Sequence, residues 1–262
     1  MKRDHSTVER RRSLILKKIR EEEHVKVEDL AREFEICPMS VRRDLQYLED
    51  RNLITRSYGG ASINPQYRTV SPEEELNLYR RLLGRYAASQ VSSGETIFIN
   101  GSMSALGLVD FLTAQNVQVV TNNGNIVGKK APKGITVTLT GGELREHVLV
   151  GDVVLRSLLD FHAEKTFLGC AGVTRNGEFC YNIPMEISIN ETMISRTTKK
   201  LYILADHTKL ENADANTPHY GSCTYDRPVT LITDEKADPR TVENLRSLGI
   251  EVFQVGINDI DY

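Results

Sequence analysis

The chain has 262 residues, 40% of them hydrophobic, which is enough to bury a sizeable core in one large or two unequal domains. Its formal net charge of −3 excludes a polycation, so any contact with nucleic acid requires a local basic patch. No stretch approaches the ~20 apolar residues of a membrane span, and the basic N-terminus lacks the apolar region of a secretion signal. We therefore expect a cytoplasmic protein that does not enter a membrane.

The cysteines indicate neither a metal site nor a disulfide framework. Cys37, Cys170, Cys180 and Cys223 lie far apart in the chain, and no two of them form a Cys-x-x-Cys pair. We expect reduced, partly buried thiols, with no metal ion and no cofactor.

Residues 1–63 predict a small helical domain that ends in a β-hairpin. Apolar residues recur at helical spacing in three segments, and Pro38 marks a break before the third. The segments are 15–19, 27–34 and 41–48. The segment 54–62 alternates in side-chain character and contains two adjacent glycines, which is typical of a short hairpin or wing. Three short helices with a wing describe a winged helix-turn-helix domain.

Beyond residue 63 the chain changes character. Residues 64–75 are proline-containing and lack periodicity, so we place an interdomain linker there. In residues 76–262 apolar strand-like segments alternate with helical ones, which favours an α/β domain with a largely parallel sheet. The expected strands are 96–100, 117–122, 135–142, 165–173, 199–206, 228–235 and 250–256. The expected helices are 76–91, 104–112, 185–196 and 239–248.

The third predicted helix has a basic exposed face. A rotation of 100° per residue from its apolar stripe places Arg43 and Gln46 on the opposite side, flanked by Ser40 and Arg42. Arginines there can contact phosphates or fork onto guanine, and Ser40 can reach a phosphate or a base edge. Asp44 lies nearer the apolar stripe, where we expect it to orient an arginine or a neighbouring helix. The same face would also suit a solvated helical hairpin used for protein contact, because charged helix faces are common.

The order of the motifs is more specific than the basic face. The run KVEDLAREFEICPMSVRRDLQYLEDRNLITRSYGGAS resembles the winged-helix reader of the DeoR family of bacterial regulators, and the resemblance extends from about residue 9 to residue 63. In that family an Arg-Arg-Asp-Leu recognition helix precedes a wing that ends in Gly-Gly-Ala. The resemblance implies that the helix reads the major groove and that the wing approaches the backbone or the minor groove. The residues expected to contact operator duplex DNA are Ser40, Arg42, Arg43 and Gln46 on the helix and Arg56 and Tyr58 in the wing.

Cys37 departs from the family pattern just before the recognition helix. The family usually has serine there, and serine is a good N-cap whereas cysteine is a poor one. Pro38 compensates in part, because its fixed φ suits the first helical position.

Glycines and small polar residues follow several predicted strands. In open α/β sheets, ligands bind beyond the carboxyl ends of the strands. The segments are 100–104, 121–123, 140–142 and 206–209. The first leads directly into a helix, so its N–H groups and hydroxyls can hold a phosphate at the positive helix end. Taken singly, each segment is also compatible with an ordinary turn. Asp206 and Lys209 are likewise compatible with a surface ion pair.

Their joint order favours a ligand site. The segments ETIFINGSMSALGLV, VVTNN, LTGGELR, LVGD, FLGCAGV and LADHTKL resemble the sensor domain of DeoR regulators over about residues 79–256. That domain is related to ribose-5-phosphate isomerase and coenzyme A transferases. The resemblance implies a site for a phosphorylated sugar, the effector. Its expected residues are Gly101, Ser102, Ser104, Asn122, Asn123, Gly141, Gly142 and Lys209, with Asp206 on the same rim.

Two residues of the expected sensor site depart from the family pattern. Met103 stands where the family usually has a small or hydroxyl residue, so its side chain either narrows the site or faces the core. His207 is unusual in the ADHTKL segment, and we assign it no role, because a lone histidine is more often structural than functional.

We expect a transcriptional repressor of carbohydrate metabolism genes, working as a dimer or tetramer and released from operator DNA by a phosphorylated sugar. The alternative is a sugar-phosphate isomerase-like enzyme with an accessory helical domain, using Glu186, Asp206 and Lys209 as base and cation. The sequence lacks the acidic catalytic run of that family, so we predict no enzyme activity. A protein-interaction adaptor would leave the basic helix face unexplained.

Overall fold

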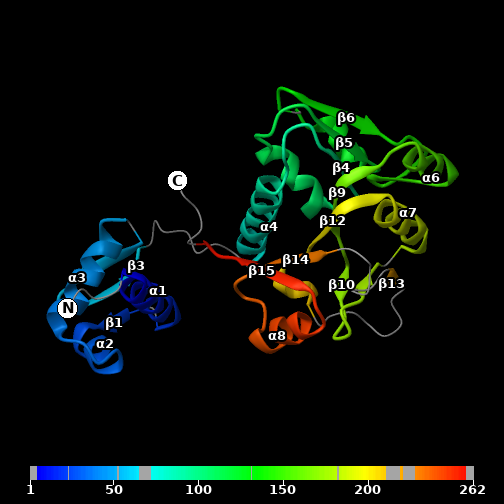
Figure 1. The fold of residues 1–262 in the computed structure, drawn as a ribbon. Coiled ribbons are helices and arrows are strands. Elements are labelled where there is room, and N and C mark those ends of the chain that lie inside the picture. The colour runs from blue at the N-terminus through cyan, green and yellow to red at the C-terminus, as the bar shows by residue number, and fades with distance from the viewer. Residues whose placement is uncertain are drawn as a thin grey trace. The chain divides into compact units, whose positions relative to one another are not determined.

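The chain forms two compact units, Met1–Ser71 and Pro72–Tyr262. The computed structural model describes residues 5–22, 24–51, 53–64, 72–130, 132–181, 183–210, 219–220 and 228–257 (Figure 1). Most of the expected linker, residues 65–71, and Cys223 lie outside the described residues.

The smaller unit is a winged helix. Its elements are α1 (His5–Glu22), β1 (His24–Lys26), α2 (Val27–Glu33), α3 (Pro38–Glu49), β2 (Ile54–Ser57) and β3 (Gly60–Ile63). The strands form an antiparallel sheet in the order β1-β3-β2. The three predicted helices and the hairpin are confirmed. Strand β1 escapes prediction because three residues are too few to show an alternation.

The apolar stripe of α3 forms the core of this unit. Val41, Leu45 and Leu48 are buried, and they share one hydrophobic cluster with Ile15 and Ile19 of α1. Residues at i, i+4 and i+7 lie on one side of a helix, so burying this side leaves the basic side of α3 exposed.

A buried carboxylate joins α1 to α3. The carboxylate of Asp44 is 1% exposed, and it accepts hydrogen bonds from Nε of Arg11 at 2.7 Å and from Nε of Arg12 at 3.0 Å. A carboxylate buried without a cation is strongly destabilising, so these pairs hold the two helices at a set spacing. Asp44 therefore orients a neighbouring helix, as predicted, and does not face solvent.

Two adjacent glycines shape the wing. Gly59 has φ +84° in the turn between β2 and β3, a backbone conformation that other residues rarely adopt. Gly60 pairs with Lys26, and a Cβ atom at Gly60 would collide with the carbonyl oxygen of Val25. The first glycine permits the turn, and the second lets β1 and β3 approach each other.

The larger unit contains a seven-stranded parallel sheet in the order β15-β14-β12-β9-β4-β5-β6. Its strands are β4 (Thr96–Ile99), β5 (Val117–Thr121), β6 (Ile135–Leu139), β9 (Ala163–Gly169), β12 (Thr197–Leu204), β14 (Val229–Asp234) and β15 (Glu251–Val255). Each of the seven predicted strand segments contributes one strand to this sheet, and the α/β fold class is confirmed.

Helices cover both faces of the sheet (Figure 1). Ile97 and Ile99 of β4 pack with α4 (Pro72–Ser89), α5 (Met103–Leu106) and the 3₁₀ helix η1 (Gly107–Phe111). Phe98, between them, packs on the other face. The helices on that face are α6 (Asp152–Leu159), α7 (Pro184–Ser195) and α8 (Pro239–Ser247). Successive strand residues point to opposite faces, so a strand buried on both sides is a continuous apolar run.

Short elements complete the larger unit. They are the hairpin β7 (Glu143–Arg145) and β8 (Val148–Val150), the small sheet β10 (Gly172–Val173), β11 (Phe179–Cys180) and β13 (His219–Tyr220), and the 3₁₀ helices η2 (Gly124–Gly128) and η3 (His207–Lys209). The predicted strand 165–173 divides into β9 and β10. Helix α6 and the short strands β7, β8, β11 and β13 are absent from the prediction.

Two predicted helices have different bounds in the structure. The helix expected from Leu76 begins at Pro72, because proline suits the first turn and three following glutamates favour the positive helix end. The segment 104–112 divides into one turn of α5 followed by η1.

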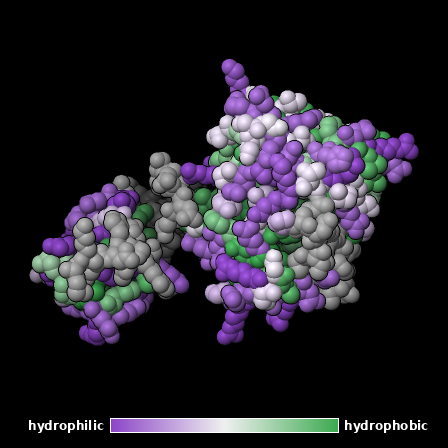
Figure 2. Space-filling model, viewed as in Figure 1, coloured by the Kyte–Doolittle hydropathy of each residue, from purple (hydrophilic) through white to green (hydrophobic). Residues whose placement is uncertain are grey.

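Polar and apolar residues are mixed on the surface of each unit (Figure 2). Hydrophilic residues spread over the visible face of both units, with hydrophobic residues between them (Figure 2). Among the described helices, none is long and apolar enough to cross a lipid bilayer.

Replacing Cys37 with serine should stabilise the start of α3. Cys37 is the N-cap residue, and its side chain makes no capping hydrogen bond. A serine hydroxyl can accept the N–H of the third helical residue, which stabilises a helix by about 1 kcal/mol. In the full chain, hydrogen exchange in the first turn of α3 should slow roughly fivefold. The control Cys37→Ala should leave exchange unchanged, and equal exchange in both variants would contradict the capping argument.

Candidate DNA interface and effector site

The predicted DNA-contacting residues of α3 lie on its solvent side. Arg42, Arg43 and Gln46 are exposed and Ser40 is half-buried. Neither Arg42 nor Arg43 pairs with another side chain in the described part of the chain. In the wing, Tyr58 is fully exposed. Arg42 and Arg43 have no acidic partner among the described residues, so they form a local basic patch. The chain as a whole carries a net charge of −3.

A polar network joins α3 to the wing. The guanidinium of Arg56 donates to Oε1 of Gln46, and its Nη1 lies 3.6 Å from Oε2 of Glu49. Gln46 in turn donates to Asp50 through Nε2 at 2.8 Å. Gln46 and Arg56 are thus engaged with each other before any DNA arrives, and they set the position of the wing relative to the helix.

The N-cap residue of α3 contacts a predicted base-reading residue. Sγ of Cys37 lies 3.2 Å from Oγ of Ser40. The departure at Cys37 therefore concerns both the helix cap, where its side chain makes no capping hydrogen bond, and the orientation of the Ser40 hydroxyl.

The larger unit has a cavity of about 550 Å³ at the switch point of the sheet. After β4, the chain continues outward through β5 and β6 on one side, and through β9 and the later strands on the other. The cavity is lined by residues that follow β4, β9 and β12. Ligands of open α/β sheets bind at such points, because the loops on the two sides diverge there. Its lining includes Asn77, Arg80, Arg81, Gly101, Ser102, Met103, Ser104, His147, Cys170, Tyr181, Glu186 and Lys209.

The loop after β4 is held by its own polar groups. Ser102 is the N-cap of α5, and its hydroxyl accepts from the N–H of Ala105 at 3.4 Å. The N–H of Ser102 donates to Oδ1 of the buried Asn100 at 3.2 Å. A Cβ atom at Gly169, the last residue of β9, would collide with the Ser102 side chain. The loop after β4 and the end of β9 therefore touch directly at the cavity wall.

Asn122 and Asn123 lie behind the cavity wall. Asn123 donates through Nδ2 to the carbonyl oxygens of Gly101 at 2.8 Å and Ser102 at 3.2 Å. Asn122 donates to the carbonyl oxygen of Leu149 at 3.1 Å. Both are buried and neither lines the cavity, so Asn123 supports the loop that does.

Gly141 and Gly142 give the backbone after β6 a conformation that other residues rarely adopt. Their φ values are +73° and +111°. A Cβ atom at Gly142 would come within 2.7 Å of the carbonyl oxygen of Val150. These two glycines are outside the cavity lining, and they permit the tight entry into β7.

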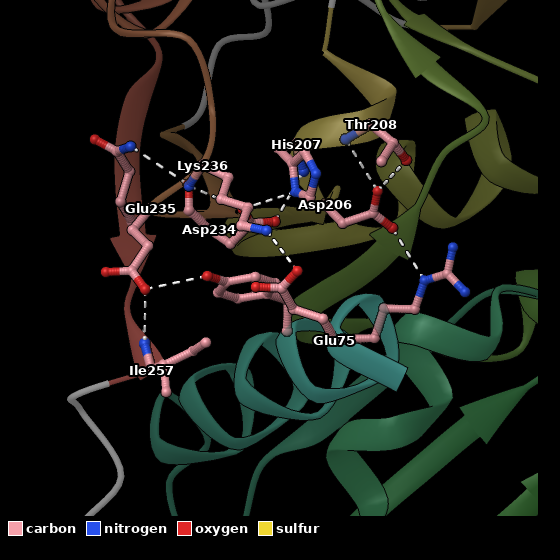
Figure 3. Close-up of polar contacts among 11 residues, drawn as sticks. Glu75, Asp206, His207, Thr208, Asp234, Glu235, Lys236 and Ile257 are labelled. Carbon is pink, nitrogen blue, oxygen red and sulfur yellow. Dashed lines mark hydrogen bonds and ion pairs between the residues drawn. The ribbon is translucent and has the colours of Figure 1, made fainter. Parts of the chain in front are cut away.

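Asp206 is also outside the lining, and its carboxylate is fully buried (Figure 3). It accepts from Nε of Arg80 at 3.0 Å and from the N–H of Thr208 at 3.2 Å. Burial acts to raise the pKa of Asp206, but the hydrogen bond from Thr208 and the charges of Lys209 and Arg80 hold it below its ordinary value. Asp206 is therefore an ionised anchor for Arg80, a cation that reaches the cavity from α4.

His207 belongs to a second polar cluster beside this anchor (Figure 3). Its backbone N–H donates to Oδ2 of the buried Asp234 at 2.8 Å, and Nδ1 of its ring lies 2.9 Å from Oδ1 of the same carboxylate. Nearby, Lys236 pairs with Glu75 of α4 at 2.6 Å, and the hydroxyl of Tyr79 donates to Glu235 at 3.1 Å. The Lys236 and Tyr79 contacts dock α4 against the segment that follows β14. The His207 contacts join η3 to the carboxyl end of β14, which is a structural role for His207.

Cations dominate the charged lining of the cavity. Lys209 is half-buried, and no described carboxylate lies within ion-pairing distance of its ammonium group. Arg80 and Arg81 line the cavity from α4. Neither arginine belongs to a motif, so the sequence by itself does not mark them as cavity residues. Met103 is 53% exposed and lines the cavity, so it does not face the core.

A winged helix with an exposed basic reading face, followed by an α/β domain with a cationic cavity, defines a DNA-binding regulator with a ligand sensor. Residues 11–67 match the family model of the DeoR-like helix-turn-helix domain, and residues 78–235 match that of the DeoR C terminal sensor domain. The chain belongs to the DeoR family of transcriptional regulators.

Relatives of similar length carry repressor names. The chain is 27% identical to the HTH-type transcriptional repressor GlcR of Bacillus subtilis, over 94% of this chain and 95% of that protein. It is 29% identical to the glycerol-3-phosphate regulon repressor of Escherichia coli, over 77% and 83%. Among solved structures, ribose 5-phosphate isomerase from Plasmodium falciparum is similar over 51% of this chain and 53% of its own, with a TM-score of 0.38 and 14% identity.

Replacing Gly169 with alanine should distort the loop after β4, because the new methyl group meets the Ser102 side chain. Overpacking of this kind costs about 1–3 kcal/mol. The double variant Gly169→Ala/Ser102→Gly should recover most of the loss in thermal stability. The control Gly107→Ala should be neutral, since nothing lies near its added Cβ and its backbone is helical. Failure of the double variant to recover stability would contradict the proposed contact.

Proposed function

We propose that this DeoR-family repressor holds operator DNA through its winged helix and leaves it when a phosphorylated sugar occupies the cavity. The observation that carries the proposal is the cavity itself. Its lining combines a capped, hydroxyl-bearing loop after β4 with Lys209, which pairs with no carboxylate in the described part of the chain, and with Arg80 and Arg81 of α4.

The loop and the cations suit a phosphate group. The N–H groups of Met103 and Ser104 belong to the first turn of α5 and have no acceptor within that helix. The hydroxyl of Ser104 and the ammonium group of Lys209 add a donor and a positive charge to the same cavity. A dianion leaves water only where several donors and a cation replace its hydration, and charge-assisted bonds contribute roughly 1.5–3 kcal/mol each.

The winged helix supplies the DNA contacts. Arg42 and Arg43 are the arginines of α3 that carry no acidic partner among the described residues, and we assign them to the major groove with Ser40. Tyr58 approaches the backbone or the minor groove, while Arg56 and Gln46 hold the wing in place. A single module of this kind covers roughly 600–1,000 Å² of protein surface, so a dimer or tetramer on a repeated operator is expected for useful affinity.

Helix α4 offers a route between the two functions. It is the first described element after the linker, and it carries Arg80, which Asp206 holds at the cavity wall. An anionic effector competes with Asp206 for this guanidinium, so binding favours a different position of Arg80. An effector shifts an equilibrium only by its differential affinity for the two states, and Arg80 provides such a difference.

Replacing Arg43 with alanine should weaken operator binding. Loss of a base contact costs about 1–3 kcal/mol on the operator and much less on random duplex DNA. Gel-shift titrations at several salt concentrations, with operators selected from a random library by the full chain, measure both affinities. Arg240→Ala, in the larger unit, is the matched control. Equal loss on both DNAs would reassign Arg43 to phosphate contact.

Replacing Lys209 with alanine should make the repressor insensitive to its inducer. Loss of one charge-assisted contact should weaken the effector at least about tenfold, with operator affinity unchanged in its absence. Pentose and hexose phosphates are titrated against operator complexes of wild type, Lys209→Ala and the control Lys200→Ala, whose lysine pairs with Glu251 instead. Equal release from all three would remove Lys209 from the site.

A further inference from the structure

One acidic side chain of the cavity has no side-chain partner in the described part of the chain. Glu186 lies in the first turn of α7, is 6% exposed and lines the cavity. Its Oε1 would lie only 2.7 Å from a Cβ atom at Gly101, so the carboxyl group sits against the loop after β4. Among the described residues, no side chain donates a hydrogen bond to this carboxyl group and no cation pairs with it.

Asn190 adds a second unused polar atom on the same side of α7. It stands four residues after Glu186, one helical turn away, and is 1% exposed. Its Oδ1 accepts from Nδ2 of Asn100 at 3.1 Å, whereas its own Nδ2 has no partner among the described residues. Asn100 also donates to the hydroxyl of Tyr181, another lining residue. Buried polar groups without partners cost free energy, which a bound ligand can recover.

No charged side chain of the cavity lining pairs with Glu186. The charged side chains that line the cavity are Arg80 and Arg81 from α4, Asp110 from η1, His147 between β7 and β8, and Lys209 from η3. None of these side chains is a cause of the raised pKa of Glu186. Burial raises the pKa of Glu186 to about 7. Near neutral pH Glu186 is therefore present in two forms. The acid form donates and accepts hydrogen bonds, and the carboxylate form only accepts them.

We propose that Glu186 is the residue that selects the sugar part of the effector, by hydrogen bonding to hydroxyl groups next to the phosphate. This inference rests on the proposed function, which places the phosphate at the loop after β4 and Lys209. The effector is then a polyhydroxylated phosphate ester. An apolar ester would leave the carboxyl group buried without a partner, and a second acidic group would meet it with like charge.

The test compares inorganic phosphate with a panel of glycerol, pentose and hexose phosphates, by calorimetry on the full chain. Wild type should bind its preferred sugar phosphate at least about tenfold more tightly than inorganic phosphate. In Glu186→Leu this preference should fall to within about threefold, while affinity for inorganic phosphate stays the same or rises. Glu186→Gln, which keeps a donor and an acceptor, should retain most of the preference. Glu191→Leu, on the exposed side of α7, is the matched control.

The outcomes separate the two proposals. Undiminished preference in a folded Glu186→Leu protein, with the same melting curve as Glu186→Gln, would overturn the role of Glu186. Tighter binding of amino-sugar phosphates than of their hydroxyl counterparts, lost in Glu186→Gln, would overturn the assignment to hydroxyl groups. If wild type binds neither inorganic phosphate nor any sugar phosphate, the proposed function fails and the selectivity role fails with it.

Discussion

The buried side-chain amide of Asn100 is the interaction on which the sensor site depends. Through Oδ1 it accepts the N–H groups of Ser102 at 3.2 Å and Gly169 at 3.1 Å. Through Nδ2 it donates to the carbonyl oxygen of Gly169 and to Oδ1 of Asn190, both at 3.1 Å. One side chain thus holds the loop after β4, the end of β9 and helix α7 together. Because a buried amide is costly when unpaired, these elements keep one spacing, and the cavity forms between them.

Buried carboxylates decide which cations remain available for anionic ligands. In the winged helix, Asp44 engages Arg11 and Arg12, while Arg42 and Arg43 stay exposed on α3. In the sensor domain, Asp206 holds Arg80, and Lys209 is left without an acidic partner among the described residues. A buried carboxylate paired with arginine therefore fixes a helix in each unit. Other positive charges stay available for the phosphate groups of the proposed ligands.

The sensor cavity divides its chemistry between two walls. Lys209 and the capped loop after β4 offer positive charge and N–H donors, which suit a phosphate group. Glu186 of α7 offers hydrogen-bonding capacity without positive charge. A phosphate ester of a polyol has the same division, since its charge is confined to one end. In the proposed function, the cationic wall holds the ester and Glu186 of α7 distinguishes one ester from another.

Local pattern alone determined the three helices and the wing of the smaller unit, through signals such as the stripe of Val41 and Leu45 on α3, and the apolar runs that form the seven strands of the parallel sheet. These signals lie within a few residues of each other, so periodicity reveals them. Which polar residues line the cavity was decided by tertiary structure. Arg80 meets Asp206 across 126 residues of sequence, a pairing that no local motif marks. Asn123 and Asp206 follow strands as ligand-binding residues do, yet packing turns them inward, since each must satisfy buried backbone or cationic groups before a ligand can use it.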